Sequence, residues 1–537
     1  MSLRSAHIRL LEALSRATPK AVAEPQRTRR VFVNRTVRMD RVEVLGFDMD
    51  YTLALYHQPK MERLSLHFST RKLVGRGYPA EITELPYDSA MAIRGLAVDR
   101  KLGNILKMDR YGYVGRAMHG TRALSRDERR HLYREQKLRL TGGRYGWIDT
   151  LYALPEAVLY SHIVEYLDRD PAFLASSADS RAARYSQLWT DIRECIDEAH
   201  RDGSIKGEIT AALSDYIVQD RELAPTLHRF RSAGRRLFLL TNSGFAYTDC
   251  VMSYLLDGQL SNYPSWRSYF DVIVVDAKKP EFFLGDRPMA FLDERGAPLA
   301  SGEPPAQRPL LCQGGNVQAL SELLAMPADR VLYVGDHIYG DMLRAKKSSV
   351  WRTAMIIQEL ETELERHAQV EESLRTLESL ERKRHRMEAE QRYQQILLQQ
   401  LDAVASEPER ASALLAASMG ELGGGDRAEM DALLANPEIR GELLSQGRSE
   451  LIRRLGELRD DLAGCLEDVY ALERDIEHTF NPYWGPLFKE GSENSRIGEQ
   501  VEDYACLYTS RVSNFLAYSP FQLFRSPRDH LPHERVY

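Results

Sequence analysis

Four short apolar runs stand out along the chain, and polar side chains follow each of them at once. The runs are Val42–Phe47, Leu237–Leu240, Val272–Val275 and Val331–Val334. Runs of this length, rich in aliphatic side chains, are typical of strands buried on both faces of a parallel sheet. Ligands of open α/β sheets bind at the carboxyl ends of the strands, so we expect the four polar groups to meet at one edge.

The spacing of these runs predicts an inserted domain. The interval between Phe47 and Leu237 is far too long for one crossover connection, so residues 57–215 are expected to fold as a cap over the carboxyl edge of the sheet. Within this cap, Tyr185–His200 and Gly207–Ile217 favour helices. The catalytic core then comprises residues 30–56 and 216–357, preceded by an N-terminal extension at 1–29.

Beyond Ile357 the pattern changes to long, charged, helix-favouring sequence. Apolar residues four and three apart form a heptad seam, which predicts a coiled coil or a helical hairpin. We therefore expect a helical insertion at 358–480 with a flexible break at Gly423–Gly425, and an aromatic C-terminal segment, 481–537, that packs on the core. The seam consists of Leu451, Leu455, Leu458, Leu462, Cys465, Val469, Leu472 and Ile476.

Composition narrows the classes of function. The chain of 537 residues is 43% hydrophobic and 28% charged, which is ordinary for a soluble protein with a large core. Its formal net charge of -6 provides no field for general nucleic-acid binding, and no apolar run approaches the roughly 20 residues that cross a bilayer. Five scattered cysteines indicate reduced thiols. We expect a cytoplasmic protein without nucleic-acid or membrane partners.

Asp48 and Asp50 follow the first apolar run. One carboxylate can act as a nucleophile that splits phosphoryl transfer to water into two steps. The other can protonate the leaving alkoxide and then take a proton from the attacking water. Carboxylates this close repel each other, and an oxygen-lined site beside a phosphate suits Mg²⁺. Taken alone, the same pair also occurs in solvated turns at strand ends.

Thr241, Asn242 and Ser243 follow the second run, and Lys279 precedes Pro280 after the third. Hydroxyl and backbone N–H groups at a strand end can hold phosphate oxygens, although the same residues are common helix N-caps. A lysine whose backbone is held extended by the following proline can direct its charge toward a phosphoryl group, although most lysines are solvated.

After the fourth run, Asp336 and Asp341 supply two further acids. Asp336 is placed to ligate a metal ion. Asp341 is expected either to be a second ligand or to orient Lys279. His337, between them, is expected to be structural and not a base.

The string Asp48–Leu53 resembles the D-x-D-x-T-[LV] nucleophile motif of haloacid dehalogenase-like phosphatases, and the four clusters occur in that superfamily's order. The resemblance implies an α/β fold: a Rossmann-type parallel-sheet core with a large inserted cap, here with an added helical or coiled-coil segment. It also implies a phosphatase whose Mg²⁺ binds Asp48, Asp336 and the main-chain carbonyl of Asp50, with phosphoryl transfer through an aspartyl-phosphate on Asp48.

Over roughly residues 29–357 and 484–534, the chain resembles the cytosolic purine 5'-nucleotidases. This resemblance implies hydrolysis of purine nucleoside 5'-monophosphates, IMP and GMP foremost, phosphotransfer to another nucleoside, and assembly into a homo-oligomer, either a dimer or a tetramer. The segments that carry it are Arg30–Asn34, Gly46–Ala54, Leu154–Glu156, Thr241–Ser243, Trp266–Phe270, Lys279-Pro280, Phe282-Phe283, Val331–Lys347 and Leu523–Glu534.

The same resemblance assigns substrate contacts in the cap. Arg193, Asp197 and His200 fall where the family holds the base, and their spacing of four and three places them on one helical face. Tyr152 falls where an aromatic ring stacks on the other side of the base, and Lys206 where a second lysine binds phosphate. The trio on the helix also fits an exposed face with an i,i+4 ion pair.

Two alternatives remain open on the sequence. A related phosphatase could apply the same chemistry to another phosphomonoester, because the cap sets specificity. A helical scaffold protein could carry an idle phosphatase domain.

Overall fold

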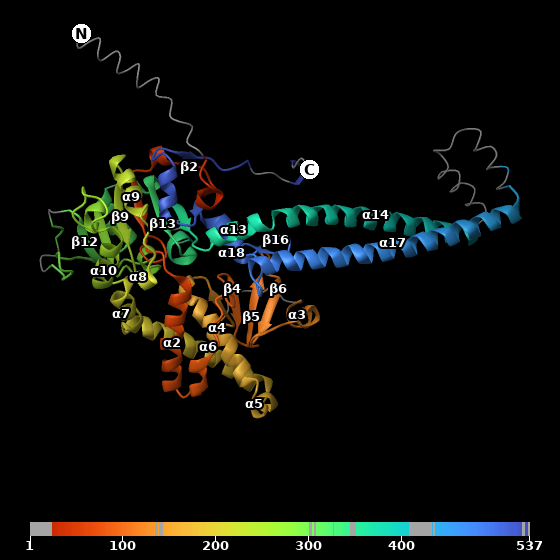
Figure 1. Cartoon of the computed structure of the whole chain (residues 1–537), viewed down its shortest axis with the longest axis horizontal. Helices are drawn as coiled ribbons and strands as arrows, with labels where there is room; N and C mark the ends of the chain where they lie inside the picture. Colours follow the sequence, from red (N-terminus) through yellow and green to blue (C-terminus); the bar gives the residue numbers. More distant parts are fainter. Residues whose placement is uncertain are drawn as a thin grey trace, which may run out of the picture. The chain divides into compact units, whose positions relative to one another are not determined.

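The computed structural model of the protein describes residues 24–134, 138, 143–299, 303–305, 308–325, 327–343, 351–406, 432, 435–528 and 532–534. The chain divides into two compact units (Figure 1). The first unit runs to Glu365 and resumes at Tyr483, and the second is Arg366–Pro482. The predicted break at Gly423–Gly425, and the predicted extension as far as residue 23, lie outside the described residues.

A nine-stranded sheet forms the centre of the first unit, in the order β1-β17-β14-β13-β3-β9-β10-β12-β11. The strands from β17 to β12 are parallel, and the two edge strands are antiparallel. All four predicted strands are present, and the predicted α/β class is confirmed. The bounds are β1 (Phe32–Val33), β3 (Val44–Phe47), β9 (Arg236–Leu240), β10 (Val272–Val275), β11 (Met289–Phe291), β12 (Leu310–Gly314), β13 (Val331–Gly335), β14 (Arg352–Ile356) and β17 (Leu507–Thr509).

Hydrophobic clusters cover both faces of this sheet. In β3, Leu45 and Phe47 belong to one cluster and Val44 to the other, because successive side chains of a strand point to opposite faces. Helices α9 and α10 pack into the first cluster, and α11 and α18 into the second. Burial on both faces explains why these strands are continuous apolar runs. The four helices are α9 (Leu223–Ser232), α10 (Phe245–Leu256), α11 (Val317–Leu324) and α18 (Arg496–Tyr504).

Residues 57–215, predicted to form the cap, contain a five-stranded antiparallel sheet in the order β7-β6-β5-β4-β8, with helices packed beside it. The helix predicted at Tyr185–His200 lies inside α6, and the one predicted at Gly207–Ile217 is broken at Ala212 into α7 and α8. The elements are α2 (Gln58–Gly75), β4 (Leu96–Asp99), β5 (Asn104–Met108), β6 (Val114–His119), β7 (Arg122–Ala123), α3 (Arg126–Tyr133), β8 (Tyr145–Ile148), α4 (Leu154–Leu167), α5 (Pro171–Ala175), α6 (Ala178–Arg201), α7 (Ser204–Ala211) and α8 (Leu213–Tyr216).

The C-terminal segment returns to the first unit. It supplies β17 to the main sheet and β18 (Leu523–Phe524), which pairs with β2 (Val37–Arg38). The buried ammonium of Lys107, in β5, donates hydrogen bonds to the carbonyls of Trp484, Pro486 and Lys489. These bonds satisfy the donors of a cation that burial would otherwise destabilise.

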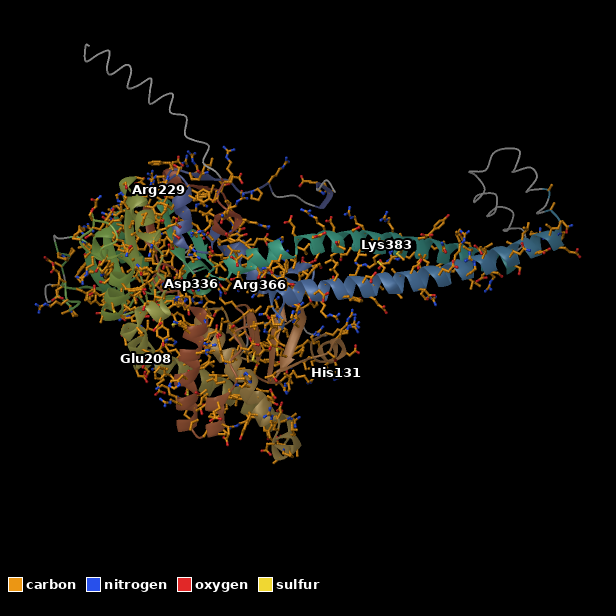
Figure 2. The ribbon with its side chains drawn as sticks, viewed as in Figure 1. His131, Glu208, Arg229, Asp336, Arg366 and Lys383 are labelled. Carbon is orange, nitrogen blue, oxygen red and sulfur yellow. The ribbon has the colours of Figure 1, made fainter. Side chains whose placement is uncertain are left out.

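The second unit is a helical hairpin of two long helices, α14 (Glu371–Ser406) and α17 (Pro437–Phe480), which follows α13 (Leu360–Gln369). Every residue of the predicted heptad seam in α17 is buried or half-buried, whereas charged side chains such as Lys383 of α14 are exposed (Figure 2). Coiled-coil geometry stays a prediction. Among the described helices, none combines the length and the apolar character needed to cross a bilayer.

An ion pair ties the cap to the core. Arg94, in the loop before β4, has a fully buried side chain and donates to both carboxylate oxygens of Glu359 at 2.6 Å. It also donates to the main-chain carbonyl of Asp336 at 3.2 Å. Asp336 itself lies at the carboxyl end of β13 on the side of the core that faces the cap (Figure 2).

We expect Arg94→Met to lower the free energy of unfolding of the first unit by about 3 kcal/mol, because removing one partner strands the other in a poorly solvated site. Urea unfolding followed by tryptophan fluorescence measures this unit alone, since all five tryptophans lie outside residues 366–482. The matched control is Arg169→Met, which breaks an exposed i,i+4 pair and should cost less than about 0.5 kcal/mol. Equal effects of the two substitutions would contradict the role given to Arg94.

Candidate active site

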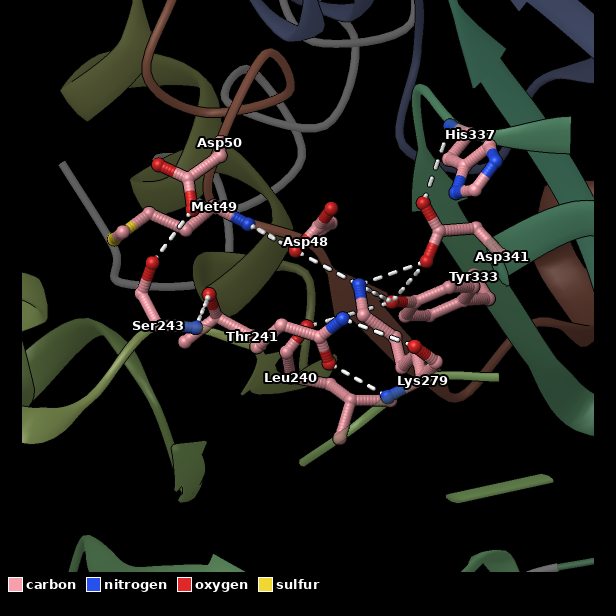
Figure 3. A network of polar contacts seen from close by, with 11 residues as sticks. Asp48, Met49, Asp50, Leu240, Thr241, Ser243, Lys279, Tyr333, His337 and Asp341 are labelled. Atoms are coloured by element: carbon pink, nitrogen blue, oxygen red, sulfur yellow. Dashed lines mark hydrogen bonds and ion pairs between the residues drawn. The ribbon is translucent and has the colours of Figure 1, made fainter. Parts of the chain in front are cut away.

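Asp48 lies directly after β3, the middle strand of the main sheet. Its N–H donates to the carbonyl of Val334 in the neighbouring β13, and its Oδ1 accepts the N–H of Met49 at 2.8 Å. The residue is only 8% exposed. The predicted nucleophile therefore has a fixed orientation at the carboxyl edge of the sheet (Figure 3).

Three carboxylates gather at this point. Oxygen atoms of Asp48, Asp336 and Asp341 all lie within 4.8 Å of one another, and all three residues are buried. Burial, with the nearby Asp341 charge, raises the pKa of Asp336 to about 7, and burial also holds the pKa of Asp48 well above its usual range. Carboxylate oxygens this close repel unless a cation separates them, so this donor set fits a hard divalent ion such as Mg²⁺.

Lys279 carries the positive charge inside this cluster. Its ammonium lies 2.8 Å from Asp48 Oδ1 and 2.7 Å from Asp341 Oδ1, and it donates to the hydroxyl of Tyr333 at 3.1 Å (Figure 3). Burial disfavours the charge, but Asp341 and Asp48 hold the pKa of Lys279 well above its usual range. The other oxygen of Asp341 accepts the N–H of His337. This contact supports the orientation of Lys279 by Asp341, and ligation of a metal ion by Asp341, which belongs to the same acidic group, stays a prediction as well.

Asp50 points away from the three gathered carboxylates. Its two oxygens accept hydrogen bonds from the hydroxyls of Tyr56, at 2.6 Å, and Ser243, at 2.8 Å. Figure 3 shows the bond with Ser243. A carboxyl group held in this way can exchange a proton with a group beside Asp48 without competing for the cation. Ligation of a metal ion through the main-chain carbonyl of Asp50 stays a prediction.

The loop after β9 is braced by its own side chains. The hydroxyl of Thr241 accepts the N–H of Ser243, and the amide of Asn242 exchanges two hydrogen bonds with the backbone of Lys279. Asn242 thus joins the loops after β9 and β10, which leaves its backbone, and not its side chain, to contact a phosphate. Phosphate binding by these three residues stays a prediction.

Lys206 reaches this loop from α7 of the cap. Its ammonium lies 3.4 Å from the hydroxyl of Ser243 and 4.9 Å from the centre of the Tyr247 ring. A cation in this position stands beside the hydroxyl that bonds to Asp50. The sequence-predicted phosphate contacts from the cap and the core are therefore brought together.

The aromatic residues assigned to the base also meet. Tyr152 packs edge-to-face against Tyr51, at 4.6 Å between ring centres, and against His200, at 5.4 Å. Burial holds the pKa of His200 below its usual range, which favours a neutral ring. Because the two rings contact each other, a base between them requires a change of side-chain position.

Arg193 and Asp197 lie on α6, two turns and one turn before His200 respectively, and both are exposed. Arg193 forms its ion pair with Glu156 of α4, at 3.8 Å, and not along its own helix face.

His337 lies beside an acid from the cap, since its Nε2 is 3.3 Å from the carboxylate of Asp149. Burial opposes a charge on the ring, but the contact with Asp149 raises the pKa of His337. This contact agrees with the structural role expected for His337.

Sequence reasoning missed four contributors: Tyr56, Tyr333, Arg94 and Glu156. Tyr56 lies in the segment that follows Asp48 in the sequence, and its short separation from Asp50 could have suggested a contact. Tyr333 is one of several residues in the apolar run Val331–Val334, and Arg94 is an isolated arginine in a loop, so neither stands out in the sequence. The contacts of Tyr333 with Lys279 and of Arg94 with Glu359 join residues far apart in the sequence, which no local pattern records.

The chain is similar in sequence to several 5'-nucleotidase domain-containing proteins. A 5'-nucleotidase domain-containing protein of Dictyostelium discoideum is 26% identical over 94% of this chain and 74% of its own length. The 5'-nucleotidase domain-containing protein 2 of Homo sapiens is 32% identical over 62% of this chain, and that of Rattus norvegicus is 31% identical over 62%. The matches span 64% and 60% of the human and rat proteins, slightly less than two thirds.

Solved structures give a weaker likeness. A β-phosphoglucomutase of Pyrococcus and a putative haloacid dehalogenase-like hydrolase of Bacteroides fragilis are each 12% identical, covering 59% of this chain and 87% of theirs. Their TM-scores of 0.26 and 0.22 are too low to carry an argument, so the fold rests on the sheet topology itself.

The sequence model of the 5' nucleotidase family matches residues 31–536, which cover the main sheet, the cap and the returning C-terminal segment. The resemblance expected from the sequence is thereby confirmed, and the chain belongs to the 5' nucleotidase family.

Proposed function

We propose that the protein is a Mg²⁺-dependent 5'-nucleotidase that hydrolyses purine nucleoside 5'-monophosphates, IMP and GMP foremost, to nucleoside and phosphate. The observation that carries the proposal is the buried group of Asp48, Asp336 and Asp341 with Lys279 among them. Family membership supports the nucleotidase activity, and the sequence resemblance supports the purine preference.

In the first step, a carboxylate oxygen of Asp48 attacks phosphorus and the bond to the nucleoside 5'-oxygen breaks. Asp50 donates its proton to that oxygen, and its hydrogen bonds from Tyr56 and Ser243 hold it in place for this transfer. In the second step, Asp50 takes a proton from water, whose oxygen attacks the phosphorus of the aspartyl-phosphate. Phosphate leaves, and the carboxylate of Asp48 is restored.

Asp48, Asp336 and the main-chain carbonyl of Asp50 would hold Mg²⁺, which supplies charge neutralisation between the phosphate and the acidic cluster. Lys279 shares this task, since its ammonium already contacts Asp48. Asp341 keeps Lys279 in position.

The cap contributes substrate contacts. Lys206 and the loop Thr241–Ser243 approach the same place and would bind phosphoryl oxygens. Farther from the phosphoryl group, Tyr152 and His200 would contact the faces of the base. Arg193 and Asp197 would form hydrogen bonds with its polar edge. Transfer of the phosphoryl group to a second nucleoside, a cytoplasmic location and assembly into a homo-oligomer are parts of the same proposal.

We expect Asp48→Asn to reduce phosphate release from IMP by more than about a thousandfold, because an amide cannot form the acyl-phosphate. Malachite-green detection of phosphate measures the rate, and tryptophan fluorescence checks that the fold is kept. Substantial turnover by a folded Asp48→Asn protein would place the nucleophile elsewhere.

Removal of divalent ions with EDTA should abolish phosphate release, and added Mg²⁺ should restore it. Asp336→Asn should raise the Mg²⁺ concentration for half-maximal rate by more than about tenfold, since one charged ligand is lost. The measurement is the rate as a function of free Mg²⁺. Full activity in EDTA would contradict the assignment of the acidic cluster.

A panel of IMP, GMP, AMP, CMP and ribose 5-phosphate, assayed at equal concentration, tests the substrate class. We expect IMP and GMP to exceed the others in kcat/KM by at least about tenfold, the size of one or two well-made polar contacts. Equal rates on the whole panel would favour a general phosphomonoesterase. No release from any member would favour the scaffold alternative.

A further inference from the structure

The first connection from the core to the cap carries a side chain that reaches back to the active site. Tyr56 lies six residues after Asp50, directly before the predicted cap begins, and it is fully buried. Its hydroxyl donates a hydrogen bond to Asp50 Oδ1 at 2.6 Å. The other oxygen of Asp50 accepts the hydroxyl of Ser243 (Figure 3). Both oxygens of this carboxyl group therefore have a donor, and one of the two donors belongs to the connection between core and cap.

The hydroxyl of Tyr56 has a second partner in the core. The hydroxyl oxygen of Tyr247, on α10, lies 3.0 Å from it. A phenol has one proton, and that of Tyr56 is already directed to Asp50, so Tyr247 is the donor in this pair. Because Tyr56 accepts on one side and donates on the other, its proton is fixed toward Asp50.

The main chain around Tyr56 is paired with the second connection, which returns from the cap to the core. The N–H of His57 donates to the carbonyl of Tyr216 at 2.8 Å. The N–H of Val218 donates to the carbonyl of Leu55, also at 2.8 Å. These bonds lie on either side of Tyr56 along the chain, so they set the direction in which its side chain leaves the main chain.

A side chain of the core anchors Tyr56 itself. Gln358 lies two residues after the end of β14, and its Nε2 donates to the main-chain carbonyl of Tyr56 at 2.6 Å. The bond joins residues that are 302 positions apart in the sequence. Gln358 therefore acts on the main chain of Tyr56, and the hydroxyl of Tyr56 acts on the carboxyl group of Asp50.

The need for Asp50 in the first step depends on the leaving group. In that step a bond forms between Asp48 and phosphorus, the bond from phosphorus to the leaving oxygen breaks, and Asp50 transfers its proton to that oxygen. The alkoxide of a nucleoside is a poor leaving group and needs the proton. para-Nitrophenolate spreads its negative charge over the ring and the nitro group, and it departs as the anion. A residue that acts through Asp50 therefore matters for a nucleoside monophosphate and not for para-nitrophenyl phosphate.

We propose that Gln358 and Tyr56 are positioning residues for proton transfer by Asp50. Gln358 fixes the connection at its main chain, and the hydroxyl of Tyr56 orients the carboxyl group. The inference rests on the proposed nucleotidase function and deepens it, since it makes departure of the nucleoside depend on a contact between the end of β14 and the connection to the cap.

The experiment measures kcat/KM for IMP and for para-nitrophenyl phosphate in the wild-type protein, Tyr56→Phe and Gln358→Met. Phenylalanine and methionine keep the size of the side chains but lack the donor groups. The constant kcat/KM covers binding and the first step only, before the aspartyl-phosphate that both substrates share is hydrolysed. With IMP we expect a loss of about tenfold or more for Tyr56→Phe and about threefold or more for Gln358→Met, with para-nitrophenyl phosphate within about twofold of wild type.

Tyr269→Phe is the matched control. Tyr269 is fully buried in the core, and its hydroxyl has no hydrogen-bond partner among the described residues, so both constants should stay within about twofold of wild type. A second comparison needs IMP alone and uses an Asp50→Asn background, in which the acid is already lost. There, neither Tyr56→Phe nor Gln358→Met should lower kcat/KM further by more than about twofold, because residues that act as a unit have non-additive effects.

Equal losses on the two substrates would show a general structural role and overturn the inference. So would an unchanged kcat/KM for IMP in both folded variants, or a full further loss in the Asp50→Asn background. Each of these results leaves the nucleotidase function intact. If Tyr56→Phe does not fold, as judged by tryptophan fluorescence on urea titration, Gln358→Met decides between the same outcomes. A wild-type protein that releases no phosphate from IMP would overturn the proposed function, and the inference with it.

Discussion

The concentration of negative charge at the end of β3 and β13 is the constraint on which the rest of the site depends. Asp48, Asp336 and Asp341 are buried within a few ångströms of one another, where solvent screens little. One ammonium, that of Lys279, enters the group, and the guanidinium of Arg94 bonds to the backbone of Asp336 from the cap side. Three carboxylates facing one ammonium leave an excess of negative charge, which favours binding of a divalent cation together with a phosphate. Folding has already brought these like charges together at a cost in free energy, and binding of a cation relieves part of their repulsion.

The parallel register explains how these charges meet. Val334 of β13 pairs with Phe47 of β3, so the residues that follow the two strands emerge side by side. Gly335 is required there, since a Cβ at that position would lie 2.5 Å from the carboxylate of Asp341. Gly46 has a similar role inside β3, where the Phe238 ring occupies the space of a side chain. Small residues at two points let the sheet and the acidic loop approach closely.

The cap is joined to this centre by polar contacts and not only by the chain connections. Arg94 with Glu359, His337 with Asp149, and Lys206 with Ser243 each link a cap residue to the core. These contacts hold the cap residues beside them in a definite relation to Asp48.

The sequence by itself determined the four strands and the order of the polar clusters that follow them, and it predicted the inserted cap and the heptad seam, because each depends on local periodicity or on a motif of adjacent residues. It also placed Asp48 at a strand end and left two roles open for Asp341. Only the tertiary structure showed that Asp341 pairs with Lys279, that Asn242 bonds to the backbone of Lys279 in the next loop, and that Glu156 rather than Asp197 pairs with Arg193. Each of these contacts joins side chains from different helices or loops that are not adjacent in the sequence. Packing sets such distances, and a one-dimensional pattern does not encode them.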